Sequence, residues 1–259
     1  MHDFDRTVAT TSIHNFRDFG GYPVVSGGRL ALRTLYRSAS HQNATEKDLD
    51  LVAQCGLTAI VDLRGTSERE KAPCRRPPGL PITVYSAPGD TAGAPHDQAV
   101  SNALDATAAR RNMCERYGDI PFRPMLVNVY RQFVKVAAEA GGPTLVYCAA
   151  GKDRTGVLVA LLHTALGVHR DDIFDDYLLT NSAGDTEARV AALRTGLEGR
   201  LGATLSEEAV RVITGVEPLF LETAFAAIAA RYGNTSTYLN DVLGVTPAVR
   251  EALAERLVR

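Results

Sequence analysis

The chain has 259 residues, of which 45% are hydrophobic and 22% charged, and its 28 Lys and Arg nearly balance 30 Asp and Glu to give a formal net charge of −2. This composition is typical of a globular protein with one ample domain, and it argues against a general nucleic-acid-binding protein. No segment approaches the roughly 18 apolar residues of a membrane span, and residues 1–11 lack the apolar core of a secretory signal.

The N-terminal region is predicted to combine a strand pair with a helix. Gly-Gly pairs at residues 20–21 and 27–28 mark turns, so residues 15–36 are predicted to form a hairpin or another paired strand segment. Residues 45–48 resemble a capping box, which predicts a helix that is ended by Gly56.

A buried strand is predicted at residues 57–64, which are apolar until they end in polar side chains. This pattern is typical of a parallel strand that carries Asp62 and Arg64 to the carboxyl edge of a sheet. A second short strand is predicted at residues 82–85.

Residues 86–122 form a long connection rich in Ala, Gly, Pro and Asp, with a possible helix near residues 103–116. A connection of this length inside a compact domain is usually functional or disordered. We interpret it as a lid or substrate-flanking insertion, with a plain surface excursion as an equal alternative.

The C-terminal half is predicted to be mostly helical. Helices are expected at residues 124–140, 171–179, 184–201, 217–231 and 247–258. Residues 182–259 are grouped as C-terminal helices within a single domain that spans residues 1–259, and the 184–201 helix is a candidate second lid. Acidic side chains near residue 171 are interpreted as helix caps or solvated-face residues rather than a metal site; they are Asp171, Asp172, Asp175 and Asp176.

The most informative stretch runs from a strand at residues 144–147 through a short loop into an apolar helix at residues 157–166. Unpaired N–H groups and the positive end of a helix make such a loop an anion site, and they favour the thiolate form of Cys148 at its mouth. Arg154 can offer a bidentate fork to two oxygens of a tetrahedral oxyanion. The alternative, a buried inert thiol, leaves Arg154 and the loop unexplained.

The pattern Cys-x-x-Gly-x-x-Arg-Thr-Gly at residues 148–156 resembles the phosphate loop of the cysteine-dependent protein tyrosine phosphatase superfamily. Flanking motifs resemble one branch of it, the bacterial tyrosine/serine protein phosphatase family typified by mycobacterial secreted phosphatase B. These motifs are Asn15-Phe16-Arg17-Asp18 with Gly20-Gly21, Tyr36-Arg37-Ser38, Asp62-Leu63-Arg64 and residues 231–245. The resemblance implies an α/β fold with a central, mainly parallel sheet flanked by helices, and the phosphate loop between a strand and a helix.

The resemblance also implies roles for the loop residues. Cys148 would attack phosphorus to form a cysteinyl-phosphate, with Arg154 on the equatorial oxygens. Thr155 would donate to the sulfur or serve only as a helix-start residue. The expected phosphate-binding residues are Ala149, Ala150, Gly151, Lys152, Asp153, Arg154 and Thr155.

The proton donor to the leaving group has several candidates, because the chain has no Trp and so lacks the Trp-Pro-Asp loop in its usual form. Asp153 inside the loop is the first candidate, in line with the resembled family. Asp62 is the second, with the alternative that it pairs with an arginine and braces the loop beside Arg64. Asp90 and Asp97 are distant thirds.

Two residues bear on thiol acidity and substrate choice. The superfamily usually has His before the nucleophile, and this chain has Tyr147. A neighbour that helps to set the loop geometry is therefore replaced. Lys152 is expected to add positive charge at the rim, which would favour polyanionic head groups such as inositol phosphates.

We therefore expect a phosphomonoester hydrolase that acts on protein phosphotyrosine, with phosphoserine/threonine and phosphoinositides as further candidate substrates. The alternatives are a phosphoinositide-preferring lipid phosphatase and a phosphoprotein-binding pseudophosphatase; a rhodanese-type sulfurtransferase fits the residues after Cys148 less well. The expected partners are phosphorylated proteins or peptides, with neither nucleic acid nor an integral membrane segment. We expect a cytoplasmic protein, or one secreted without a classical signal.

No metal or cofactor is expected. The six histidines form neither a His-x-His nor a His-Glu-x-x-His pattern. The four cysteines are expected to be free thiols, because a chain this long needs no disulfide and a catalytic thiolate requires reducing conditions.

Overall fold

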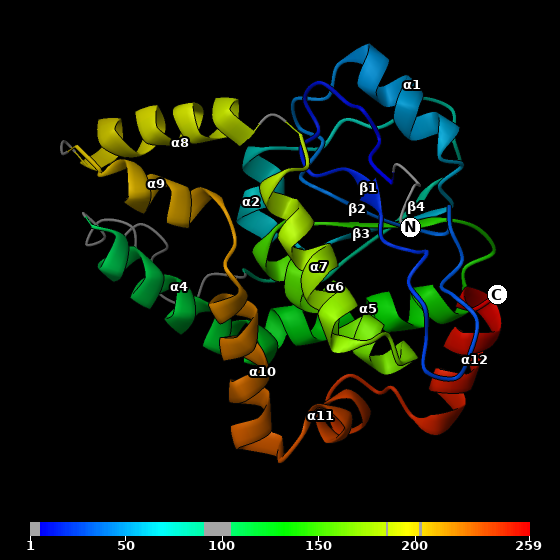
Figure 1. Cartoon of the computed structure of the whole chain (residues 1–259). Coiled ribbons are helices and arrows are strands. Elements are labelled where there is room, and N and C mark those ends of the chain that lie inside the picture. Colours follow the sequence, from blue (N-terminus) through cyan, green and yellow to red (C-terminus); the bar gives the residue numbers. More distant parts are fainter. Residues whose placement is uncertain (1–5, 91–104, 185, 202–203) are drawn as a thin grey trace.

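A computed structural model describes residues 6–90, 105–184, 186–201 and 204–259. Its centre is a five-stranded sheet with the order β1-β2-β5-β3-β4, in which β1 is antiparallel to β2 and the other pairs are parallel (Figure 1). The strands are β1 (Arg17–Asp18), β2 (Leu35–Ser38), β3 (Ala59–Asp62), β4 (Thr83–Ser86) and β5 (Thr144–Tyr147). The predicted α/β fold with a mainly parallel sheet is confirmed, as is the buried parallel strand after Gly56. The paired strand segment predicted at residues 15–36 is β1 with β2, although β2 extends to Ser38.

Helices surround this sheet (Figure 1). The first half of the chain has α1 (Glu46–Gln54), α2 (Thr66–Lys71), α4 (Ala106–Asp119), the 3-10 turn η1 (Ile120–Phe122) and α5 (Pro124–Glu139). Then follow α6 (Asp153–Leu166), α7 (Arg170–Leu178), the 3-10 turn η2 (Leu179–Asn181), α8 (Thr186–Leu201), α9 (Glu207–Thr214), α10 (Pro218–Tyr232), α11 (Thr235–Asp241) and α12 (Pro247–Leu257).

The strand register brings three chain segments to one edge of the sheet. β5 lies between β2 and β3, and Tyr147 at its end stands opposite both Ser38 and Asp62. Because the carboxyl ends of parallel strands meet at the same edge, the loops after β2, β3 and β5 surround one place. That place is the loop that carries Cys148.

The two faces of the sheet belong to two hydrophobic clusters. Val146 and Cys148 belong to the larger cluster, which includes much of α5 and α6, whereas Leu145 and Tyr147 belong to a smaller cluster with residues of α1. This alternation is the period-2 pattern of a strand buried on both sides. Cys148 and Tyr147 therefore point to opposite faces.

Helices α4, α8 and α9 lie together on one side of the molecule, where α4 contacts α9 and α10 (Figure 1). The helix predicted near residues 103–116 is α4, and residues 91–104 of the predicted insertion lie outside the described residues. Three helices were not predicted: α2, α9 and α11. Each is six to eight residues long, shorter than the window of roughly 11 to 18 residues in which a helical hydrophobic pattern is read from sequence.

No single helix among the described residues is long and apolar enough to cross a membrane. One bent pair, Glu207–Thr214 with Pro218–Tyr232, passes the same test by length and composition alone.

Candidate active site

The loop between β5 and α6 is tight because Gly151 allows it. Gly151 has a φ of 67°, and a Cβ there would lie 2.3 Å from the Ser38 carbonyl oxygen. Cys148 at the start of the loop is 2% exposed, whereas Ala149 and Ala150 are exposed to solvent. The loop is thus pressed against the end of β2 on one side and open to solvent on the other.

The loop becomes a helix at Asp153. The N–H of Gly156 donates to the Lys152 carbonyl at 2.7 Å, so the N–H groups before it have no intrahelical acceptor. Those groups and the positive end of α6 suit an oxyanion held close to Cys148. Thr155 is fully buried in the first turn, and its hydroxyl has no hydrogen-bond partner among the residues that the structure describes.

Arg154 is held in a fixed orientation by a residue that sequence reasoning missed. Its Nη1 and Nη2 donate to the two carboxylate oxygens of Glu68 at 2.6 and 2.8 Å. Glu68 is fixed in turn, because one of its oxygens accepts the Gly65 N–H at the start of α2 at 3.0 Å. The Arg154 carbonyl also accepts the Tyr130 hydroxyl at 2.6 Å. Glu68 thus holds the Arg154 guanidinium by its Nη1–Nη2 edge and fixes its orientation before any phosphate arrives.

Asp153 lies within a cluster of positive charge. Its Oδ1 accepts from Lys152 Nζ and from the Tyr117 hydroxyl, both at 2.9 Å, and its Oδ2 lies 3.3 Å from Arg116 Nη2. Burial opposes ionisation of this carboxyl, but the charges of Lys152 and Arg116 outweigh burial and lower its pKa to about 2. Asp153 is therefore ionised near neutral pH when the site is empty.

Lys152 is not at the rim as predicted. It is 6% exposed, and its Nζ also donates to the Gly215 carbonyl at 3.1 Å, between α9 and α10. The prediction that Lys152 adds positive charge at the rim was wrong, because Asp153 and the Gly215 carbonyl hold its Nζ in a buried position.

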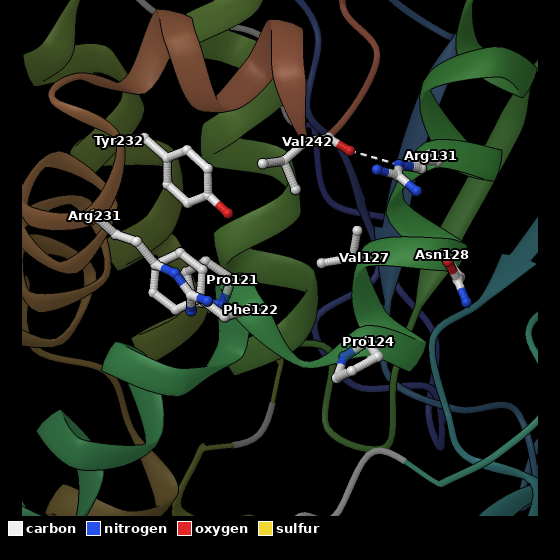
Figure 2. Close-up of a pocket in the computed structure, with 9 residues that line it drawn as sticks. All are labelled: Pro121, Phe122, Pro124, Val127, Asn128, Arg131, Arg231, Tyr232 and Val242. Carbon is white, nitrogen blue, oxygen red and sulfur yellow. Dashed lines mark hydrogen bonds between the residues drawn. The ribbon is translucent and has the colours of Figure 1, made fainter.

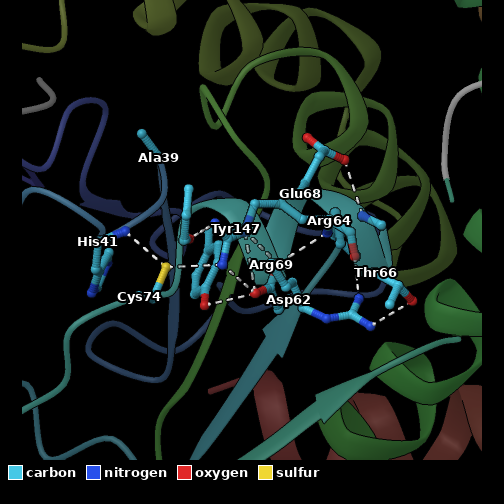
Figure 3. A network of polar contacts seen from close by, with 12 residues as sticks. Ala39, His41, Asp62, Arg64, Thr66, Glu68, Arg69, Cys74 and Tyr147 are labelled. Atoms are coloured by element: carbon cyan, nitrogen blue, oxygen red, sulfur yellow. Dashed lines mark hydrogen bonds and ion pairs between the residues drawn. The ribbon is translucent and has the colours of Figure 1, made fainter. Parts of the chain in front are cut away.

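Asp62 lies in a second network (Figure 3). It is the register partner of Tyr147, so its side chain lies on the sheet face of Tyr147, opposite to that of Cys148. Its carboxylate accepts from Arg64 Nε and Nη2 at 3.0 and 2.8 Å and from the Tyr147 hydroxyl at 3.0 Å. Arg64 Nη2 also lies 3.1 Å from the Cys74 sulfur, which accepts the His41 backbone N–H at 3.2 Å. Asp62 thus makes the arginine pair foreseen as its alternative role, and Tyr147 is bonded into the same network.

The remaining acid candidates lie elsewhere. Asp90 is exposed and accepts from the Ser67 N–H and hydroxyl at 2.9 and 2.8 Å, and these bonds lower its pKa. Asp97 lies outside the described residues. Of the four candidate acids, Asp153 alone belongs to the loop.

Two further residues escaped the sequence argument besides Glu68, namely Arg116 and Tyr117. Both lie on α4, far from Asp153 in sequence, so no local motif indicated that they contact Asp153. Glu68 had a local signal, since it stands three residues after Gly65 at a helix start, which is the spacing of a capping box.

A separate cavity of about 290 Å³ lies away from the loop, between α5 and the C-terminal helices (Figure 2). Phe122 and Tyr232 form part of its wall, and Arg131 and Arg231 stand at its sides. Within the described residues no group of three or more His, Cys, Asp or Glu side chains is placed to hold a metal ion. All four cysteines are free.

Comparison with known proteins gives consistent matches over nearly the whole chain. The model of the tyrosine phosphatase family matches residues 8–259. A protein of Cupriavidus necator named as a tyrosine-protein phosphatase is 32% identical over 244 residues, which cover 93% of this chain and 85% of the relative. The triple specificity protein phosphatase PtpB of Mycobacterium tuberculosis is 31% identical over 266 residues, which cover 90% of this chain and 92% of PtpB.

Among solved structures, the crystal structure of P. aeruginosa TpbA aligns with 66% of this chain and 88% of its own, at 18% identity and a TM-score of 0.34.

Proposed function

The chain belongs to the tyrosine phosphatase family, and from that membership we propose that it removes phosphate from phosphotyrosine in proteins with Cys148 as its nucleophile. The observation that carries the assignment of the residues is the position of Cys148 at the mouth of a helix-start loop whose Arg154 is already oriented by Glu68. Nucleophile, N–H cradle and guanidinium fork are the parts that phosphoryl transfer needs.

In the first step, the Cys148 sulfur forms a bond to phosphorus while the bond from phosphorus to the phenolic oxygen breaks. The loop N–H groups from Ala149 to Arg154 and the Arg154 guanidinium hold the three equatorial oxygens. The leaving phenoxide takes a proton, for which we propose Asp153 as the donor. In the second step, water attacks the cysteinyl-phosphate, inorganic phosphate forms, and the thiolate is restored with the Thr155 hydroxyl as its proposed hydrogen-bond donor.

The low pKa of Asp153 in the free enzyme sets a condition on this role. A donor must be protonated, and Asp153 is ionised while Lys152 and Arg116 neutralise it. A bound phosphate dianion brings negative charge close to both cations and to Asp153, which raises the pKa of the carboxyl toward the working pH. In the second step the ionised carboxylate is the form that accepts a proton from the attacking water.

Asp62 and Arg64 have a supporting role in this proposal. Asp62 is engaged by Arg64 and Tyr147, and as the register partner of Tyr147 it lies on the sheet face opposite to Cys148. We propose that this pair braces the strand end beside the loop rather than exchanging protons with substrate.

Phosphoserine, phosphothreonine and phosphoinositides are further candidate substrates, because the relative PtpB is named a triple specificity phosphatase. The buried position of Lys152 removes the main argument for a preference for phosphoinositides. The location of the protein, in the cytoplasm or outside the cell, remains a prediction.

The test is phosphate release by wild type, Cys148→Ser and the control Cys55→Ser from a phosphotyrosine peptide, a phosphoserine peptide and a set of phosphoinositides. We expect release from the phosphotyrosine peptide by wild type and Cys55→Ser, its loss in Cys148→Ser, and inhibition by vanadate. Release by Cys148→Ser at the wild-type rate would refute the assignment of the nucleophile. Binding of phosphopeptide without release by wild type would identify a pseudophosphatase instead.

A further inference from the structure

The carbonyl of Gly151, at the tightest point of the phosphate loop, accepts two hydrogen bonds from behind. Asn15 Nδ2 donates to it at 2.7 Å and Arg37 Nη2 at 3.0 Å, and both side chains are 1% exposed or less. Neither residue comes from the loop or from α6. Asn15 precedes β1, and Arg37 lies within β2.

These two bonds constrain more than one carbonyl. In a planar trans peptide the carbonyl of one residue and the N–H of the next point in opposite directions. Fixing the Gly151 carbonyl toward Asn15 and Arg37 therefore turns the Lys152 N–H toward the other side of the loop. That N–H is one of the proposed donors to phosphate. The direction in which the loop N–H groups point therefore depends on residues that do not contact the phosphate themselves.

The two donors are themselves held in place. Arg37 Nη1 donates to Asp176 Oδ2 at 2.8 Å, and Arg17 Nη2 donates to the Asp176 backbone carbonyl at 2.7 Å. Arg17 Nη1 also donates to the side-chain oxygen of Asn15. Because that oxygen faces a guanidinium, which can only donate, the Asn15 amide must present its NH₂ group to Gly151.

Asp176 departs from its predicted role as a helix cap or solvated residue. It is 1% exposed on α7 and pairs with two buried arginines. Burial opposes ionisation of the Asp176 carboxyl, but the positive charges of Arg17 and Arg37 outweigh burial and lower its pKa to about 2.

Resting on the function proposed above, we propose that Asn15, Arg37 and Asp176 are positioning residues that hold the Gly151 carbonyl and thereby aim the loop N–H groups at the transferring phosphoryl group. Asn15 and Arg37 hold the carbonyl directly, and Asp176 orients Arg37. The backbone of Asn15 has a φ of 57°, a conformation that asparagine and aspartate tolerate better than most residues.

The decisive variant is Asn15→Asp. It keeps the size and the backbone preference of the residue and can still accept from Arg17, but it replaces the donor to Gly151 with a second acceptor. We expect kcat/KM for p-nitrophenyl phosphate to fall by roughly 10- to 100-fold, because small misplacements of positioned groups have effects of that size. The inhibition constant of vanadate, which mimics the transition state, should rise by a similar factor.

Arg37→Lys provides a second test, since lysine keeps the charge but cannot reach Asp176 and Gly151 with a planar fork. As in Asn15→Asp, we expect kcat/KM to fall and the inhibition constant of vanadate to rise. The matched control is Arg256→Lys. Arg256 also donates to backbone carbonyls, those of Ala137, Ala140 and Gly142, but at the opposite end of β5.

Inhibition constants separate positioning from mere stability, because they do not depend on the fraction of folded protein. The proposal holds if vanadate affinity and kcat/KM fall together in Asn15→Asp and Arg37→Lys while Arg256→Lys keeps both. It is overturned if both variants, folded by circular dichroism, keep vanadate affinity within about twofold. Vanadate binding measured by calorimetry needs no turnover, so a wild type that releases no phosphate would refute the proposed function and still allow this test.

Discussion

Asp62 and Asp153 are both buried carboxylates beside the same loop, yet their surroundings differ. Asp62 is bonded by Arg64, two residues further along the chain, and by Tyr147 on the neighbouring strand. Asp153 is bonded by Lys152, by Arg116 and Tyr117 on α4, and through Lys152 to Gly215. One network is local to the sheet edge, and the other draws on helices outside the sheet. The difference lies in charge: Asp62 has one cationic partner, Arg64, whereas Asp153 has two, Lys152 and Arg116, and the second comes from a helix outside the sheet. In the proposed function Asp62 therefore braces the strand end, and Asp153 exchanges protons with the substrate.

Among variants that keep the Cys148 nucleophile, Asp153→Asn is expected to have the largest effect on turnover. The amide cannot give or take the proton, so kcat for a phosphotyrosine peptide should fall by about 10²- to 10³-fold, within the range of general acid–base catalysis. The measurement is kcat across pH 5 to 8. A variant that keeps wild-type kcat throughout would remove Asp153 from proton transfer.

Asp62→Asn is expected to affect stability rather than chemistry. Breaking its pair with Arg64 leaves a buried guanidinium without a charged partner, which should lower the free energy of unfolding by about 3 kcal/mol. Urea unfolding measures this change. The distinction between the two carboxylates fails if turnover per folded molecule falls as far in Asp62→Asn as in Asp153→Asn.

The two regions should also lose stability in different pH ranges. Burial, followed by the charge of Arg64, lowers the pKa of His41 from 6.5 to about 3, so only the unfolded chain takes up this proton as pH falls from about 6.5 to 3. Stability is then lost at up to about 1.4 kcal/mol per pH unit. The pKa values of Asp153 and Asp176 are lowered from 3.8 to about 2, so their contribution of about 2 kcal/mol each is present above pH 4 and lost between pH 4 and 2.

Unfolding free energies measured from pH 7 to 2 check both ranges. His41→Gln should reduce the slope without abolishing it, because burial lowers the pKa of His163 as well. A slope identical to that of wild type would show that His41 is not held neutral by the fold.

Tyr147→Phe tests the local network more gently. It removes the bond from the Tyr147 hydroxyl to Asp62, so the free energy of unfolding should fall by about 1 kcal/mol. We expect kcat to stay within about threefold of wild type, because Tyr147 faces away from Cys148. A far larger loss of kcat would mean that this residue supports the thiolate as the usual His does.

Arg116→Gln should give the smallest effect and the most specific one. Loss of this cation weakens the ionised form of Asp153 and raises its pKa, so the alkaline limb of the kcat profile should move up by about half a pH unit. Arg110→Gln is the control, because Arg110 on the same helix pairs with Glu208 and Glu217. A shift in both variants, or in neither, would contradict the proposed link between Arg116 and Asp153.

Local patterns were sufficient for most of the architecture. Short runs of consecutive residues encode several elements that were predicted correctly. These are the buried strand ending at Asp62, the capping box at Thr45 and the helix after Cys148. The short helices α2, α9 and α11 were missed because six to eight residues do not fill the window of roughly 11 to 18 residues in which a helical pattern is read. Lys152 and Asp176 were misjudged because burial depends on what the rest of the chain places over a residue.

The sequence by itself determined the α/β fold and the loop from Cys148 to Gly156, because strand, tight turn and helix start are encoded by neighbouring residues. Only the tertiary structure decided which side chains complete that loop. The contacts of Glu68 with Arg154, of Arg116 with Asp153, and of Asn15 and Arg37 with Gly151 each join residues separated by 37 or more positions. Such pairs arise when the strand order and helix packing bring distant segments to one edge of the sheet, and no spacing in a single sequence records that.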